Sequence, residues 1–285
     1  MVDGALGSLR EPLGWIHFTG GEPLLDRKHF VALAKETRKR HTGSIGIATN
    51  GYWGQTRRSS ESMVDEMKKL GVNGVLLSVD SFHQKVIPIK VVENAAMAIA
   101  EAGLRNHSWI VASLLSDDTG DLLLTDEESL RMASAISERS GIPVARNDVR
   151  AIGRGSETSI STRRDIPQGM CRDLACCLGE TGPFEPKMIW IDPYSNVLIC
   201  YGVVIGSLRH NTLQEIIDSY DPKSNFILQT LAERGPKGLH ALAEETFRMT
   251  LSGPFRDECD LCFQSRRQLR TEYPSILGPA ECYPE

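Results

Sequence analysis

Apolar residues in the first 150 positions alternate between short continuous runs and stretches with helical spacing. Short apolar runs favour buried strands, and a period near 3.6 residues favours amphipathic helices. This pattern predicts strands at residues 15–18, 44–48, 75–79, 108–115 and 142–149, and helices at residues 26–41, 60–70, 91–100 and 125–140. Because parallel strands need crossover connections, the alternation predicts a parallel α/β sheet.

The periodicity fades after residue 150 and changes character further along the chain. The stretch MIWIDPYSNVLIC predicts a hairpin with its turn at residues 192–196. Two Thr-x-x-Glu capping boxes, at Thr125 and Thr212, predict helix starts. Two further helical stretches precede Cys259, and the tail from residue 271 is expected to be irregular. We therefore expect two domains, residues 1–155 and 156–285.

Composition and charge exclude several classes of partner. The net charge is −5, which argues against nucleic acid or an anionic membrane as the main partner. The longest uncharged run, residues 193–208, is too short and too interrupted to span a bilayer. No N-terminal apolar signal segment is present, so a cytoplasmic protein is expected. The basic run at residues 38–40 is interpreted as a solvated helix end.

The seven cysteines all follow residue 170. An odd number without a signal segment argues against a disulfide framework. The asymmetry predicts a cysteine-poor scaffold followed by a cysteine-bearing annex.

Ligands of parallel α/β proteins lie at the carboxyl ends of the strands. Residues 19–23 (TGGEP) follow the first predicted strand, 49–51 (TNG) the second, and 78–83 (SVDSFH) close the third. Singly, each is also compatible with a simple tight turn. Together they predict a polar-ligand site, with His83 as a candidate lining residue. His17, inside a strand, is interpreted as a core histidine with satisfied hydrogen bonds.

Four segments together, FTGGEPLL, ATNG, LLSVDSFH and AIGRG, resemble the radical S-adenosylmethionine (SAM) superfamily, and more narrowly its members with a SPASM or twitch annex. The resemblance covers residues 15–262. It implies an α/β fold, a partial (β/α)6 TIM-like barrel that lacks its first strand, and SAM as cofactor. It also implies that the methionyl amine is held by the GGE segment and that further cofactor contacts lie on later strands. The implied cofactor-binding residues are Gly20, Gly21, Glu22, Asn50, Ser78, Asp80 and Arg154.

The CxxxCxxC motif that holds the [4Fe-4S] cluster in this superfamily is absent from the 285 residues. Three explanations stay open. The first strand and cluster loop lie upstream of Met1, the protein is a clusterless relative, or another polypeptide supplies the strand. The first is favoured, because residues 1–14 resemble the end of the first helix.

The cysteine series resembles the SPASM/twitch pattern and implies one auxiliary [4Fe-4S] cluster. Its implied ligands are Cys171, Cys177, Cys200, Cys259 and Cys262. Ser195 stands where the family usually has glycine, and Gln268 replaces a cysteine of the second cluster. Zinc is the structural alternative, since four thiolates suit it equally. Cys176 and Cys282 are interpreted as bystanders.

Two functions follow from the resemblance. The first is an enzyme that generates a 5'-deoxyadenosyl radical and modifies a substrate, with a peptide or protein side chain as the expected class and an electron donor as partner. The second is a non-catalytic binding or adaptor module with a metal-stapled annex.

Overall fold

The computed structural model describes residues 5–115, 124–149, 166–167, 169, 188–248 and 255–283. Contacts divide the chain into two compact units. Residues 9–149 belong to the first, and the described residues 5–8 and those from 166 onward belong to the second. The expected domain boundary at residues 155/156 lies outside the described residues, so it stays a prediction.

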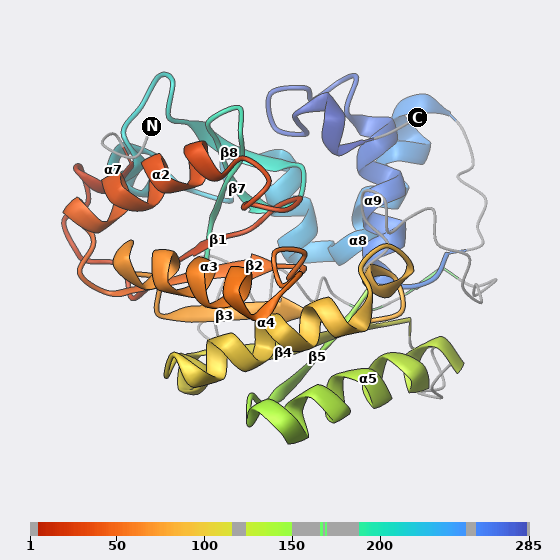
Figure 1. The fold of residues 1–285 in the computed structure, drawn as a ribbon. Helices are drawn as coiled ribbons and strands as arrows, with labels where there is room; N and C mark the ends of the chain where they lie inside the picture. The colour runs from red at the N-terminus through yellow and green to blue at the C-terminus, as the bar shows by residue number, and fades with distance from the viewer. Residues whose placement is uncertain are drawn as a thin grey trace. The chain divides into compact units, whose positions relative to one another are not determined.

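The first unit is a parallel α/β layer, as predicted (Figure 1). Its sheet has the order β1-β2-β3-β4-β5, and every neighbouring pair is parallel. The strands are β1 (Trp15–Phe18), β2 (Ser44–Thr49), β3 (Gly74–Ser78), β4 (Trp109–Leu114) and β5 (Val144–Asp148). The crossover helices are α2 (Arg27–Arg40), α3 (Arg57–Lys69), α4 (Ile89–Glu101) and α5 (Leu124–Ser140). A sixth barrel strand is not among the described residues.

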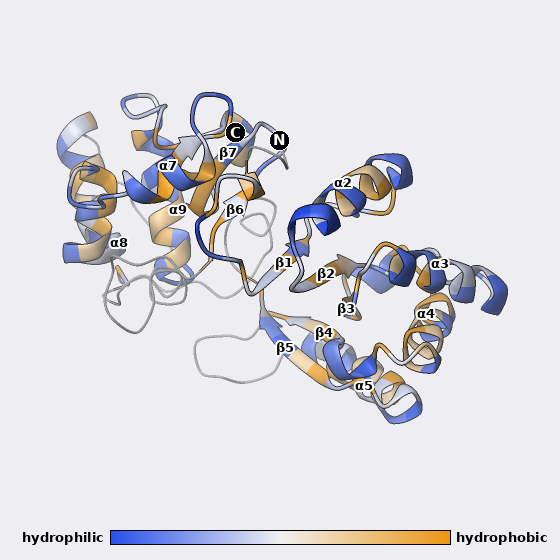
Figure 2. Cartoon of the chain, turned by 90° about the vertical axis from the view of Figure 1, so that its left-hand side faces the viewer, coloured by the Kyte–Doolittle hydropathy of each residue, from blue (hydrophilic) through white to orange (hydrophobic). Residues whose placement is uncertain are grey.

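All four helices lie on one side of the sheet, and the strands follow an arc (Figure 2). Along β2 and β4, buried residues alternate with half-buried ones. The buried residues face the helices, and the half-buried ones face the opposite side of the sheet. On the helix side Phe18 packs edge-on against Phe30 of α2, with ring centroids 5.6 Å apart. The core between the layers includes Ile45, Ile47, Val64, Met67, Leu77, Val92, Ile99 and Ile110. Each such buried side chain contributes about 2 kcal/mol to stability.

The opposite face of the sheet keeps its side chains partly exposed. The residues at these alternate positions are Gly46, Ala48, Leu76, Ser78, Val111 and Ser113. Small and polar residues predominate there because no helix of this unit covers them (Figure 2). This face and the carboxyl ends of the strands are therefore the parts of the unit that can receive a ligand.

The four helices of the first unit begin one to three residues away from their predicted starts, and two of these differences concern capping. Helix α3 begins at Arg57, because Thr56 caps it: Thr56 Oγ1 accepts from the Ser59 N–H at 3.1 Å, and Ser59 Oγ accepts from the Thr56 N–H at 3.0 Å. The expected capping box at Thr125 is wrong, since α5 begins at Leu124 and Thr125 lies within it. Serine in place of the usual glutamate concealed the first cap.

The last strand, β5, begins at Val144, two residues later than expected. Pro143 precedes it, and its missing N–H excludes it from donating to the ladder. Its carbonyl still accepts from the Ile110 N–H at 2.9 Å.

The second unit contains the predicted hairpin. Strands β6 (Trp190–Ile191) and β7 (Asn196–Cys200) are antiparallel. Asp192 closes the turn, because its Oδ1 accepts from the N–H groups of Tyr194 and Asn196 at 2.9 and 2.8 Å. Ser195 has φ 71°, a left-handed conformation that favours glycine.

The described part of this unit also contains a third strand, β8 (Val203–Ser207), and the helices α7, α8 and α9, whose bounds follow. Helix α7 (Leu213–Asp218) begins at the predicted capping box, in which Glu215 Oε2 accepts from the Thr212 N–H at 2.8 Å. Helix α8 (Phe226–Phe247) is kinked at Gly235. Helix α9 (Glu258–Leu269), which the sequence reading did not predict, packs beside α8 (Figure 1). The core includes Ile199, Val203, Ile227, Leu231, Leu239, Phe263 and Leu277.

Among the helices of the described residues, none combines the length and the apolarity needed to span a bilayer.

Candidate functional site

The Gly20–Gly21 segment follows β1 with an open backbone. Both glycines are exposed, with φ of 92° and 52°. A Cβ added at either position would meet no atom within 4 Å, so glycine is required here for its conformation and not for space. Among the described residues, no hydrogen bond uses the N–H of either glycine. The segment therefore presents bare amide groups at the carboxyl end of β1.

The Glu22 carboxylate ties the end of β1 to the end of β2. Its Oε1 accepts from the Leu24 N–H at 3.2 Å and from the Thr49 hydroxyl at 3.0 Å. Its Oε2 accepts from the Asn50 N–H at 2.7 Å. The Thr49 hydroxyl in turn accepts from the indole N–H of Trp53 at 3.0 Å. These contacts fix the carboxylate in place and still leave lone pairs for an added donor.

Asn50 is brought beside Glu22 through its backbone. Its side-chain Oδ1 accepts from the Tyr52 N–H at 3.0 Å, which shapes the turn after β2. The Tyr52 hydroxyl then donates to the Leu24 carbonyl at 2.8 Å, which links this turn to the GGEP segment. The two predicted segments, TGGEP and TNG, therefore form one structural assembly.

Asp80 is fully buried at the end of β3 and is held by donors from its own turn and from β4. Its Oδ1 accepts from the N–H groups of Phe82 and His83 at 3.1 and 3.0 Å. Its Oδ2 lies 3.4 Å from the N–H of Ser113. The His83 Nδ1 lies 2.8 Å from Oδ1. The Asp80 carboxylate therefore bonds to groups of the protein itself, and it fixes the turn after β3 and the position of His83.

His83 is the partly exposed member of the Asp80–His83 pair. Its side chain is 39% exposed, whereas that of Asp80 is 0% exposed. The hydrogen bond to Asp80 raises the pKa of His83; burial opposes this, and the charges of Asp80 and Glu22 add to the rise. Strands β1, β2 and β3 are parallel neighbours, so Glu22, Asn50 and Asp80 follow strands that end at the same edge of the sheet. That this edge forms a single concave site stays a prediction.

Two other predicted residues are not brought into these contacts. Ser78 lies at the last position of β3, partly exposed on the face without helices. Arg154 lies outside the described residues, so its assignment stays a prediction. Sequence reasoning did not identify Thr49, which donates to Glu22, or Trp53, which donates to Thr49. The signal for Thr49 was its position directly at a strand end.

His17 differs from its expected role. Its Nε2 is buried without a hydrogen-bond partner in the part of the chain that the structure describes. The ring lies edge-on to Trp15, with centroids 5.9 Å apart, and Gly46 leaves room for it where any Cβ would collide with Nδ1. Burial lowers the pKa of His17. The expected satisfied core histidine is therefore not found.

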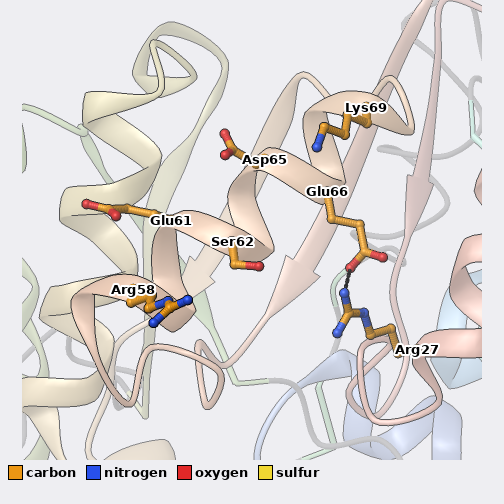
Figure 3. Close-up of a pocket in the computed structure, with 7 residues that line it drawn as sticks. All are labelled: Arg27, Arg58, Glu61, Ser62, Asp65, Glu66 and Lys69. Atoms are coloured by element: carbon orange, nitrogen blue, oxygen red, sulfur yellow. Dashed lines mark ion pairs between the residues drawn. The ribbon is translucent and has the colours of Figure 1, made fainter.

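A pocket of about 460 Å³ lies away from these residues, on α3 (Figure 3). Its lining is Arg27, Arg58, Glu61, Ser62, Asp65, Glu66 and Lys69. Figure 3 shows Glu66 turned toward Arg27 of α2, where the two form an ion pair at 2.6 Å. No sequence-predicted site residue lines this pocket, which carries charges of both signs.

Three of the five predicted metal ligands are described. Cys200 ends β7, and Cys259 and Cys262 lie one turn apart on α9. All three are more than nine-tenths buried, and none forms a disulfide among the described residues. Cys171 and Cys177 lie outside the described residues, as does Cys176. Within the described ranges, no three His, Cys, Asp or Glu residues are grouped as a metal site.

Cys282 is buried in the same core as Cys200 and Cys262. Burial raises the pKa of its thiol, and the charge of Arg266 acts in the opposite direction. Its neighbour Tyr283 stacks on Phe263 with ring centroids 5.3 Å apart. Cys282 thus shares a core with two of the predicted metal ligands, and its interpretation as a bystander stays a prediction.

Replacement of Glu22 tests the link between β1 and β2. Glu22→Gln loses the charge that three donors share, and we expect the free energy of unfolding to fall by about 1–3 kcal/mol. Urea denaturation measures it. The control is Glu61→Gln, an exposed glutamate on α3 whose pairing with Arg57 is solvated, with an expected change under about 1 kcal/mol. Equal effects of the two substitutions would contradict the structural role of Glu22.

Comparison with known proteins places this geometry in context. Residues 6–125 match the model of the radical SAM superfamily. A 79-residue segment is 30% identical to YydG of Bacillus subtilis (strain 168), a protein whose name carries a provisional assignment to peptide biosynthesis. That segment is 28% of this chain and 24% of YydG, so the match spans about a quarter of the relative's length. The matched region of the superfamily model contains Gly20, Gly21, Glu22, Asn50, Ser78 and Asp80, and the first unit thus carries a radical SAM domain match.

Proposed function

We propose that this chain is part of a radical SAM iron–sulfur enzyme that modifies a peptide or protein side chain. The observation that carries the proposal is the edge formed by Gly20, Gly21 and Glu22, inside the region that matches the superfamily model. Bare amide groups and a fixed carboxylate suit a cofactor that bears both an amine and polar oxygens. SAM, when bound, supplies the 5'-deoxyadenosyl group of the radical chemistry.

The residues of the first unit would bind and orient this cofactor. Glu22 would accept from the methionyl amine, since its carboxylate is held by Thr49 and Asn50. The Gly20 and Gly21 backbone would allow close approach, and Ser78 would lie along the cofactor on the open face of the sheet. His83 would face the same edge with Asp80 behind it. Arg154 belongs to the proposed set by resemblance.

The first 170 residues contain no cysteine, so they supply no thiolate that could hold a SAM-cleaving cluster beside Glu22. No step is therefore assigned to that cluster in this chain.

The second unit contains buried thiols of the kind that bind a metal as thiolates. Cys200, Cys259 and Cys262 are buried, and two of them project from one helix at the spacing of a turn. Cys171 and Cys177 would complete the set. We propose an auxiliary [4Fe-4S] cluster here, of the SPASM/twitch kind, with zinc as the alternative.

The substrate class rests on the provisional name of YydG, which supports a peptide. An electron donor is then a required partner. Location in the cytoplasm stays a prediction.

Anaerobic reconstitution of the 285-residue chain with iron and sulfide tests the annex. We expect about four irons and four acid-labile sulfides per chain, the content of one [4Fe-4S] cluster. Cluster binding should also stabilise the fold of the second unit, because thiolates from separate segments converge only in the folded state. Iron and sulfide analysis measures this, with a Cys259→Ser/Cys262→Ser variant as the control. Zinc at one per chain without sulfide would contradict the cluster.

The second candidate is a binding or adaptor module, favoured by the absence of cysteine from residues 1–170. Two observations distinguish the enzyme from the binding module. An in-frame CxxxCxxC in the coding DNA before Met1 supports the enzyme, and SAM-independent binding of a peptide supports the module.

A further inference from the structure

Arg266 is a fully buried cation on α9. It is 1% exposed, and it follows Cys259 and Cys262 at seven and four residues, on the same face of the helix. Its guanidinium donates to the Tyr201 carbonyl at 2.5 Å and to the Tyr283 hydroxyl at 3.2 Å. Its position is thereby fixed against the segment after Cys200 and the segment after Cys282.

Two aromatic rings hold the guanidinium from the sides. The Arg266 Cζ lies 5.9 Å from the centroid of the Phe263 ring and 5.7 Å from that of Tyr283. The Tyr283 hydroxyl donates onward to the Gly202 carbonyl at 2.6 Å. These cation–π contacts and hydrogen bonds fix the position of the guanidinium.

Cys200, Cys262, Cys282 and Tyr283 share one apolar core. Arg266 reaches this core through the Tyr283 hydroxyl and through the carbonyl of Tyr201, the residue that follows Cys200. It also lies one helical turn after Cys262 on α9. A fixed positive charge therefore lies beside the core that contains these buried thiols.

We propose that Arg266 is the fixed counter-cation of the thiolate site in the second unit, a positioning residue that stabilises the more negative state of an iron–sulfur cluster held there. The inference rests on the proposed auxiliary cluster. Buried thiolates and a cluster carry net negative charge, and the interior screens a nearby cation much less than water does. A cluster that gains one electron becomes more negative, so the cation favours the reduced form.

The experiment compares variants of the 285-residue chain after anaerobic reconstitution with ferrous iron and sulfide. Arg266→Met removes the charge with similar bulk, and Arg266→Lys keeps a charge in a different shape. Arg267→Met is the matched control, because Arg267 is exposed on the next position of the same helix. Potentiometric titration with dithionite, followed by electron paramagnetic resonance, gives the one-electron midpoint potential of each.

Arg266→Met should disfavour the reduced form about tenfold, equal to a fall of about 59 mV in midpoint potential. Arg266→Lys and Arg267→Met should stay within about a third of that shift. Equal shifts in Arg266→Met and Arg266→Lys, or no shift in either, would overturn the inference. If Arg266→Met retains no cluster, retention in Arg266→Lys supports the charge, and loss in both shows a purely structural side chain.

A wild-type chain that takes up zinc without sulfide would refute the auxiliary cluster and the inference with it. Failure of the inference alone looks different: the wild-type chain carries iron and sulfide, and its potential does not depend on the charge at residue 266.

Discussion

The 285-residue chain, reconstituted with iron and sulfide and mixed with SAM and dithionite, is expected to release no 5'-deoxyadenosine above background. No cysteine stands in residues 1–170 to hold a cluster beside Glu22. In the resembling superfamily the SAM amine and carboxylate also chelate that cluster. Loss of such a chelate weakens binding by several kcal/mol, on the order of a thousandfold.

Joining a segment with CxxxCxxC upstream of residue 1 should restore both tight binding and 5'-deoxyadenosine release. Liquid chromatography of the reaction measures the product, and isothermal titration measures SAM affinity. The matched control carries the same segment with its three cysteines changed to alanine. Release by the 285-residue chain alone would assign the cleavage to the second unit and contradict the division of roles proposed above.

Much of the first unit could be predicted from the sequence because its signals are local. Continuous apolar runs gave four of the five strand starts to within a residue, and the alternation with helices predicted the parallel order. The failures have local causes too. Serine at residue 59 concealed a cap, and Pro143 delayed β5. The hydrophobic pattern predicts an element reliably where buried positions repeat along it. It is less reliable for the first and last residues of a helix or strand, because single side-chain contacts determine where the element begins and ends.

The candidate site was predictable as a set of strand ends but not as a network. Sequence placed Glu22, Asn50 and Asp80 at one edge, since parallel strands end together. It did not indicate that Glu22 is held by Thr49, or that the Asp80 carboxylate is fully buried under His83. Those features depend on contacts between residues about 30 positions apart in the chain, such as Asp80 with Ser113. Side-chain partners at that distance leave no periodic trace.

The second unit was less predictable for a related reason. Helix α9 mixes charged and apolar residues along its length, and most of its residues are buried, including the charged Asp260 and Arg266. A helix buried on several sides loses the alternation of apolar and polar faces from which helices are recognised. The spacing of Cys259 and Cys262 pointed to a metal site, and the spacing alone did not show that a helix presents them.

The Asp80–His83 pair should give the largest stability effect in the first unit. Asp80→Ala leaves the N–H groups of Phe82, His83 and Ser113 without their acceptor in a buried turn, and we expect the free energy of unfolding to fall by about 3 kcal/mol. Asp65→Ala, an exposed aspartate on α3, is the control, with an expected change within about 0.5 kcal/mol. Urea denaturation at pH 6 measures both.

Asp80→Asn separates charge from hydrogen bonding, because its amide oxygen still accepts while the charge is lost. Burial would raise the pKa of Asp80, but its bonds to His83 and the charge of that ring prevail and lower it below 3.8. The stabilisation from Asp80 is therefore present above pH 3.8 and is lost as pH falls through the lowered pKa. The pKa of His83 is raised above 6.5, so its contribution is full below pH 6.5 and is lost as pH rises through the raised value. The stability difference between wild type and Asp80→Asn should thus be largest between pH 3.8 and 6.5 and should shrink on both sides. Urea denaturation from pH 3 to 9 tests this, and a difference that does not change with pH would show that the pair carries no ionic interaction.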